Sequence, residues 1–183
     1  MQVADVVQSE LDSLAFTMEQ AKLAGNWEDV ERLMQLPPLI EQGEARTPRN
    51  LVRKYGGAAR RINDNTDYLK GFLFNSEYNG LDVIRYLRGI HVTQEALLNE
   101  GSKHTISEIV DQVDVPIFFV MGKFDYMTSV NAAKTYYDSM KAPMKAFIVF
   151  EESAHYPQFE EKENFARWLN KTFDALQNGR VEF

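Results

Sequence analysis

Hydrophobic residues follow two different patterns along this chain, and the change of pattern lies near residue 105. Before that point, apolar residues recur at helical spacing in short segments that Gly, Pro and Asn interrupt. No stretch there alternates like a strand, so the first part is predicted to be helical. We expect helices up to Gly25, over Trp27–Leu36 before Pro37-Pro38, from Thr47-Pro48 to Gly56-Gly57, and over 67–74, 81–88 and 93–99, with Asn26 and Thr47 as caps.

The second part is typical of alternating strands and helices. After a stretch at 105–113 that reads as a helical turn, Val115–Met121 and Ala146–Phe150 are unbroken runs rich in β-branched and aromatic residues. Such runs suit parallel strands that are covered on both faces and joined by a right-handed crossover. A helix begins between them at Thr128 or Ser129, and a final helix begins near Lys162. Their apolar stripes are Val130, Ala133, Tyr137 and Met140 in the first, and Phe165, Leu169, Phe173 and Leu176 in the second.

One candidate functional side chain follows each predicted strand. Asp125 comes a few residues after the first strand, and His155 comes a few residues after the second. Because parallel strands end at one edge of a sheet, we expect Asp125 and His155 to meet there. An acid and a base follow the nucleophile of an α/β-hydrolase triad in this order. However, no Gly-x-Ser-x-Gly occurs in the chain, so it contains no recognisable nucleophile.

Composition narrows the class of protein further. The chain has 183 residues, of which 44% are hydrophobic, and this is enough to form a core. Its net charge of −7 argues against nucleic acid as a partner. The absence of cysteine excludes disulfides and thiolate chemistry, and the three histidines lack metal-ligand spacing. We expect no metal, no cofactor, no signal peptide and no membrane span, which leaves a cytoplasmic location as the default.

Two motifs resemble those of α/β-hydrolase-fold serine hydrolases, in particular the group that includes proline iminopeptidases. The stretch Val115–Thr128 is similar to the family's penultimate strand and acid loop, and Phe150–Glu161 to its last strand and histidine loop. The resemblance implies that Asp125 is the triad acid and His155 the general base. The helical first part resembles the family's cap, with a less specific match over Ser9–Pro38. The implied fold is a partial α/β-hydrolase fold, with a cap at 1–105 followed by the last two parallel βα units of the core at 106–183.

The chain also departs from the family pattern. Met121 stands where the family often has His, and the segments that carry the nucleophile and the oxyanion hole have no counterpart. The chain is therefore expected to be a fragment, a product of an internal start, or half of a split enzyme, and to be inactive alone. Its first strand would lack a neighbour, which favours homo-oligomerisation, strand exchange or a complementary N-terminal fragment. The substrate would be a small ester, amide or peptide.

Other candidate residues have simpler interpretations. Ser129 reads as a helix cap, Ser153 lacks the strained turn of a nucleophile, and His91 and His104 follow no strand. The glutamate pairs at 151–152 and 160–161 are expected to be solvated. A cap glutamate could bind a substrate amine, and the sequence offers Glu10, Glu19 and Glu44. The aromatic residues of the first part are more typical of core than of a pocket: Tyr55, Tyr68, Phe72, Phe74, Tyr78 and Tyr86.

The alternative to an enzyme is a non-catalytic binding or regulatory module derived from a hydrolase. In that case Asp125 and His155 are relics of the parent site. Recovery of activity on addition of the missing half, and its loss in His155→Ala, would separate the two hypotheses.

Overall fold

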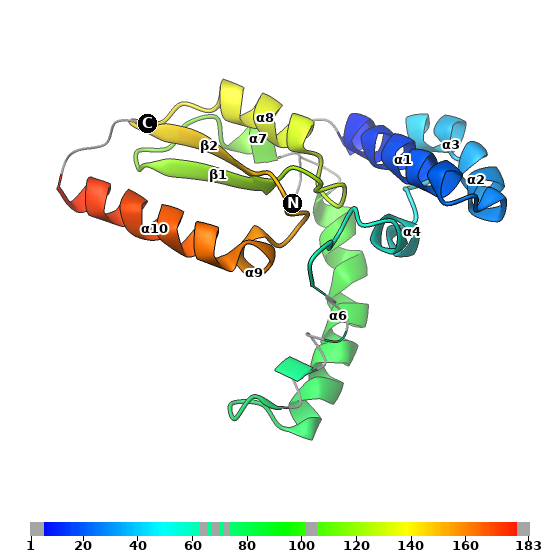
Figure 1. Ribbon diagram of the computed structural model, residues 1–183, viewed down its shortest axis with the longest axis horizontal. Helices are drawn as coiled ribbons and strands as arrows, with labels where there is room; N and C mark the ends of the chain where they lie inside the picture. The colour runs from blue at the N-terminus through cyan, green and yellow to red at the C-terminus, as the bar shows by residue number, and fades with distance from the viewer. Residues whose placement is uncertain (1–5, 63–65, 67–69, 72–73, 102–105, 179–183) are drawn as a thin grey trace.

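The computed structural model describes residues 6–62, 66, 70–71, 74–101 and 106–178. Within these residues the protein combines a helical region with a small α/β unit (Figure 1). The helical region begins with α1 (Val6–Leu23), α2 (Trp27–Met34), α3 (Pro37–Glu41) and α4 (Arg49–Lys54). Helix α1 packs against α2, α3 and α4. Their shared core contains Leu14, Leu33, Ile40 and Leu51, all of which are buried.

The ends of these helices confirm some of the predicted caps and correct others. Asn26 caps α2, as predicted, by accepting a hydrogen bond from the Asp29 N–H at 3.4 Å. Pro37 does more than follow α2, because it also begins the short helix α3, which the sequence pattern did not predict. The prediction that Thr47 caps α4 is wrong. Its hydroxyl instead donates to the Glu10 carbonyl of α1 at 2.8 Å.

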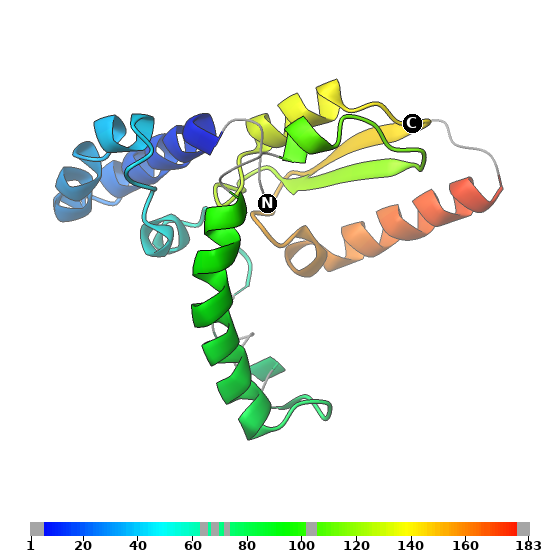
Figure 2. The same ribbon diagram turned by 180° about the vertical axis from the view of Figure 1, so that it is seen from behind.

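A long helix, α6 (Gly80–Gly101), extends away from the rest of the protein (Figures 1 and 2). It replaces the two shorter helices predicted at 81–88 and 93–99, since Gly89 sits inside the helix without interrupting it. The prediction that the aromatics of this region belong to the core is wrong for Phe74, Tyr78 and Tyr86, which are exposed. Tyr55 is half-buried and bonds to Asp29. Most of the predicted helix at 67–74, together with Tyr68 and Phe72, lies outside the described residues.

The sheet has the predicted parallel arrangement. After a single helical turn, α7 (Ile106–Ile109), strand β1 (Ile117–Gly122) pairs in parallel with β2 (Lys145–Phe150). Helix α8 (Val130–Ser139) forms the crossover between them. The register places Gly122 opposite Phe150, so both strands end at the same level.

Helices cover both faces of this sheet (Figure 1). Helix α8 lies on one face, where the rings of Phe119 and Tyr137 are 5.6 Å apart. The short α9 (Pro157–Glu160) and the long α10 (Lys162–Gln177) lie on the other, where the Phe118 and Trp168 rings are 6.2 Å apart. Successive residues of a strand face opposite ways, which explains why adjacent phenylalanines contact different helices. Phe173, predicted to lie on the buried stripe of α10, is exposed.

Candidate active site

The loops that follow β1 and β2 lie against each other at the carboxyl edge of the sheet. The Lys123 N–H donates to the Phe150 carbonyl at 2.9 Å, and the Phe124 N–H donates to the Ser153 carbonyl at 3.0 Å. A Cβ atom on Gly122 would lie 1.9 Å from the Ala154 carbonyl oxygen, a distance that no side chain permits. The close approach of the two loops therefore depends on glycine at this position.

Asp125 is held by its own loop. Its carboxylate is buried, with 5% of the residue exposed. Oδ1 accepts the N–H groups of Met127 at 3.0 Å and of Thr128 at 2.9 Å. Oδ2 accepts the Thr128 hydroxyl at 2.7 Å and lies 2.9 Å from Nδ1 of His155. Four donors thus surround one carboxylate, which fixes its orientation and stabilises its negative charge.

His155 lies directly against this carboxylate, where the sequence predicted that it would lie. Because an ionised carboxylate can only accept, Nδ1 donates the hydrogen bond, and in the neutral ring Nε2 then carries the lone pair. No residue in the described part of the chain bonds to Nε2, and 35% of the side chain is exposed. The hydrogen bond to Asp125 raises the pKa of His155 above its ordinary value, although burial and the charge of Arg53 act against it. The pair can therefore take up a proton at Nε2 while Asp125 steadies the resulting cation.

Two buried glutamates hold the histidine loop, and their burial corrects the prediction that they are solvated. Glu161 accepts the Ser153 hydroxyl at 2.6 Å and the Glu152 N–H at 3.1 Å. Glu160 accepts the Ala154 N–H at 3.4 Å. Burial raises the pKa of Glu161, but its hydrogen bonds outweigh this and lower the pKa below the ordinary value. Nothing in the sequence distinguishes these carboxylates from the pair at 151–152, which is exposed as predicted.

A segment of the helical region joins the two loops. The Gly57 carbonyl accepts the Tyr126 N–H at 2.9 Å, and the next carbonyl, of Ala58, accepts the His155 N–H at 3.0 Å. Further along, the N–H groups of Arg60 and Arg61 donate to Glu160 at 3.1 and 3.3 Å. These contacts join residues that are about 70 to 100 positions apart in sequence, so no local pattern could have revealed them.

The same helical region also stacks on the acid loop. The rings of Phe16 and Tyr126 lie 3.9 Å apart and almost parallel. Asp12 of α1 accepts the Ser129 hydroxyl at 2.9 Å, at the start of α8. The first part of the chain is thus bonded to both loops that carry the acid and the histidine.

The other sequence candidates lie elsewhere or are already engaged. Ser153 is fully buried and donates to Glu161, while Ser129 caps α8 by accepting the Ala132 N–H at 3.3 Å. Glu10 is buried against Arg49 at 2.5 Å, and Glu19 and Glu44 are exposed. The side chains of His91 and His104 lie outside the described residues.

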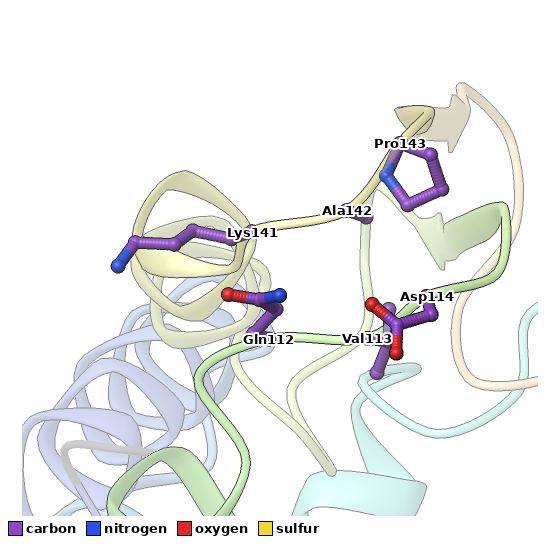
Figure 3. A pocket seen from close by; sticks show the side chains of 6 residues that line it. All are labelled: Gln112, Val113, Asp114, Lys141, Ala142 and Pro143. Carbon is purple, nitrogen blue, oxygen red and sulfur yellow. The ribbon is translucent and has the colours of Figure 1, made fainter.

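A cavity of about 350 Å³ lies at the opposite edge of the sheet, beside the segments that lead into β1 and β2 (Figure 3). Its lining consists of Gln112, Val113, Asp114, Lys141, Ala142 and Pro143. Neither Asp125 nor His155 contributes to it, so the cavity and the acid–histidine pair are separate features. Across the described ranges, no three His, Cys, Asp or Glu side chains gather as a metal site requires. None of the described helices combines the length and apolar character needed to cross a bilayer.

The sequence is similar to that of a curated protein from a bacterium. The chain is 30% identical over 116 residues to a protein of Bacillus subtilis (strain 168) named "Probable aminopeptidase YbaC". The match covers 63% of this chain but only 36% of that relative. No protein-family model matches the chain, and no solved structure matches it.

Proposed function

We propose that this chain supplies the acid and the general base of a serine hydrolase of the α/β-hydrolase type. The observation that carries the proposal is the hydrogen bond between His155 Nδ1 and the buried, fully bonded carboxylate of Asp125. A catalytic base needs an oriented ring whose second nitrogen is not bound within the protein. The His155 ring is oriented by Asp125, and 35% of its side chain is exposed. The likeness to a protein named a probable aminopeptidase supports hydrolysis as the reaction class.

In this proposal His155 Nε2 takes the proton of a nucleophilic hydroxyl as that oxygen attacks the carbonyl carbon of the substrate. The imidazolium then returns the proton to the leaving group, and a water molecule repeats the cycle to release the acyl group. Asp125 keeps the Nδ1–H tautomer and stabilises the cation in both steps. The substrate is an ester, an amide or a small peptide.

The nucleophile and the oxyanion donors come from polypeptide that this sequence does not contain. Among the described residues, Ser129 and Ser153 are engaged in capping and in binding Glu161, and neither lies on a Gly-flanked turn. Residues 1–105 would form the cap and 106–183 the end of the catalytic core. We further propose that this other polypeptide contributes a strand to the edge of β1 that pairs with no strand of the described residues, and that in its absence this edge pairs with a second copy of the chain.

Complementation tests this proposal. The chain is co-expressed with the portion of the Bacillus subtilis relative that the match does not cover, and the complex is assayed with p-nitrophenyl esters and aminoacyl p-nitroanilides. We expect hydrolysis to fall by a factor of about 10³ or more in His155→Gln and in Asp125→Asn. Asp138→Asn, which alters an exposed carboxylate of α8, is the matched control and keeps full activity.

Two outcomes would contradict the proposal. A complex whose hydrolysis is unchanged in His155→Gln would show that another base operates. A folded complex with no activity on either substrate class would favour the alternative, a binding or regulatory module that retains the pair as a relic.

A further inference from the structure

Thr128 occupies an unusual position beside the acid–histidine pair. It provides two of the four donors to Asp125, its N–H to Oδ1 at 2.9 Å and its hydroxyl to Oδ2 at 2.7 Å. Oδ2 is also the oxygen that bonds to His155. Because the carboxylate only accepts, the hydroxyl of Thr128 has one possible direction, and it shares the charge of Oδ2 with the imidazole.

We propose that Thr128 is a positioning residue of the site: its hydroxyl fixes the charge and orientation of Asp125 Oδ2 and thereby the orientation of the His155 ring. The inference rests on the proposed function, since a positioning role has catalytic meaning only if His155 is the base. The alternative role for this hydroxyl, capping α8, is filled by Ser129, whose hydroxyl accepts the Ala132 N–H. The Thr128 hydroxyl is therefore left to donate its hydrogen bond to the carboxylate of Asp125.

The consequence of losing the hydroxyl follows from the geometry. Asp125 is 5% exposed, so Oδ2 would keep only the imidazole as a donor. The oxygen would then hold more negative charge against Nδ1–H, which favours the protonated ring. The charge of Arg53 lowers the pKa of His155, and the ring of Tyr156 lies 5.0 Å from the ring of His155. Neither of these contacts depends on Thr128, so both stay constant in the comparison.

Three substitutions separate this role from simple packing. Thr128→Ser keeps the hydroxyl and loses a methyl group. Thr128→Val keeps the volume, loses the hydroxyl and leaves no space for water. Thr128→Ala loses the hydroxyl but opens space in which a water molecule can donate to Oδ2. The positioning role ranks the variants Val, then Ala, then Ser in decreasing effect, whereas packing alone makes Val the mildest of the three.

The measurement is an NMR titration of the His155 ring in this chain as it stands, with its signals assigned from His155→Gln. We expect the pKa of His155 to rise by about half a unit in Thr128→Val, by less in Thr128→Ala and hardly at all in Thr128→Ser. In the background of Asp125→Asn, Thr128→Val should have no further effect on His155. In the complemented enzyme, Thr128→Val should lower kcat about tenfold at unchanged KM.

The titration tests the positioning role of Thr128, and complementation tests the proposed function, so the two can fail independently. An unchanged His155 pKa in Thr128→Val, or a shift that persists in Asp125→Asn, overturns the positioning role. A ranking by side-chain volume also overturns it. If Thr128→Val does not fold, the difference between Thr128→Ala and Thr128→Ser decides by the same criterion. Failure of complementation would count against the proposed function but would leave the titration result standing.

Discussion

The acid loop and the histidine loop meet at one edge of the sheet, yet they are held in place by different kinds of contact. The carboxylate of Asp125 takes three of its four donors from Met127 and Thr128, which follow it by two and three positions in sequence. The backbone of His155 is bonded to Ala58, and its loop to the two glutamates at 160–161. A short turn thus orients the carboxylate of Asp125 itself, although Tyr126 in the same loop also bonds to Gly57. The loop of His155 lacks such a turn and depends on Ala58 and on the glutamates at 160–161.

This difference indicates which substitutions should disturb the geometry of the Asp125–His155 pair. A local turn re-forms whenever its few residues are ordered, since the entropy of closing it is small. A loop held by distant segments loses its position when any of them moves. We therefore expect substitutions at the tertiary contacts to disturb His155 more than Asp125, and the following predictions run from the largest expected effect to the smallest.

The strongest test of the contact between the loops is Gly122→Ala. The added methyl group would overlap the Ala154 carbonyl oxygen at 1.9 Å, and a backbone atom cannot move aside as a flexible side chain can. We expect a loss of about 3 kcal/mol or more in the free energy of unfolding, measured with urea. The control is Gly89→Ala inside α6, where a Cβ meets nothing within 4 Å, and which should stabilise by about 0.5–1 kcal/mol. Equal effects in the two variants would mean that the loops do not need their close approach.

Glu160→Ala breaks the tertiary support of the histidine loop. The N–H groups of Arg60, Arg61 and Ala154 lose their acceptor, and we expect a cost of about 2–3 kcal/mol in the free energy of unfolding. Amide exchange should accelerate at His155 more than in the acid loop. The control, Glu163→Ala, alters an exposed carboxylate in the first turn of α10 and should cost about 0.5 kcal/mol. Equal acceleration in both loops would contradict the proposed difference between them.

Asp125→Asn tests the local side of the comparison through its pH dependence. Asp125 raises the pKa of His155, so the pair adds stability that is complete below the ordinary His value of 6.5. That contribution fades as the pH rises through the higher folded pKa. In Asp125→Asn this pH-dependent loss of stability should be absent. The free energy of unfolding at pH 6 should be lower than that of the unsubstituted protein by about 2 kcal/mol. Urea unfolding from pH 5.5 to 9 measures the free energy of unfolding of both proteins. If the two curves of this free energy against pH were parallel, the prediction would be contradicted.

Ser153→Ala is the mildest test and concerns Glu161. Hydrogen bonds, that of Ser153 among them, lower the pKa of Glu161, so its contribution is present above the ordinary value of 4.5 and is lost as the pH falls through the folded pKa. Removing the hydroxyl should cost about 1 kcal/mol at neutral pH and move acid unfolding to a higher pH. Circular dichroism against pH follows the transition. Ser139→Ala, at the exposed end of α8, should leave it unmoved.

The alternation of strand and helix after residue 105 was predictable because burial on both faces of a parallel strand leaves a continuous apolar run. β1 and β2, their parallel pairing and the meeting of Asp125 with His155 all follow from that pattern. The long helix α6 was not predictable as one element. Gly89 looked like an interruption, although a single glycine costs a helix only about 1 kcal/mol.

The sequence by itself determined which two side chains meet, since the carboxyl ends of two parallel strands lie at one edge of the sheet. Only the tertiary structure decided how they are held. Glu160 and Glu161 are buried and Glu151 and Glu152 are exposed, although all four look alike in sequence. The reason is physical: burial of a carboxylate is favourable only where enough donors converge on it. For Glu161 they include groups of the preceding loop, and for Glu160 they include Arg60 and Arg61, which are about a hundred positions away.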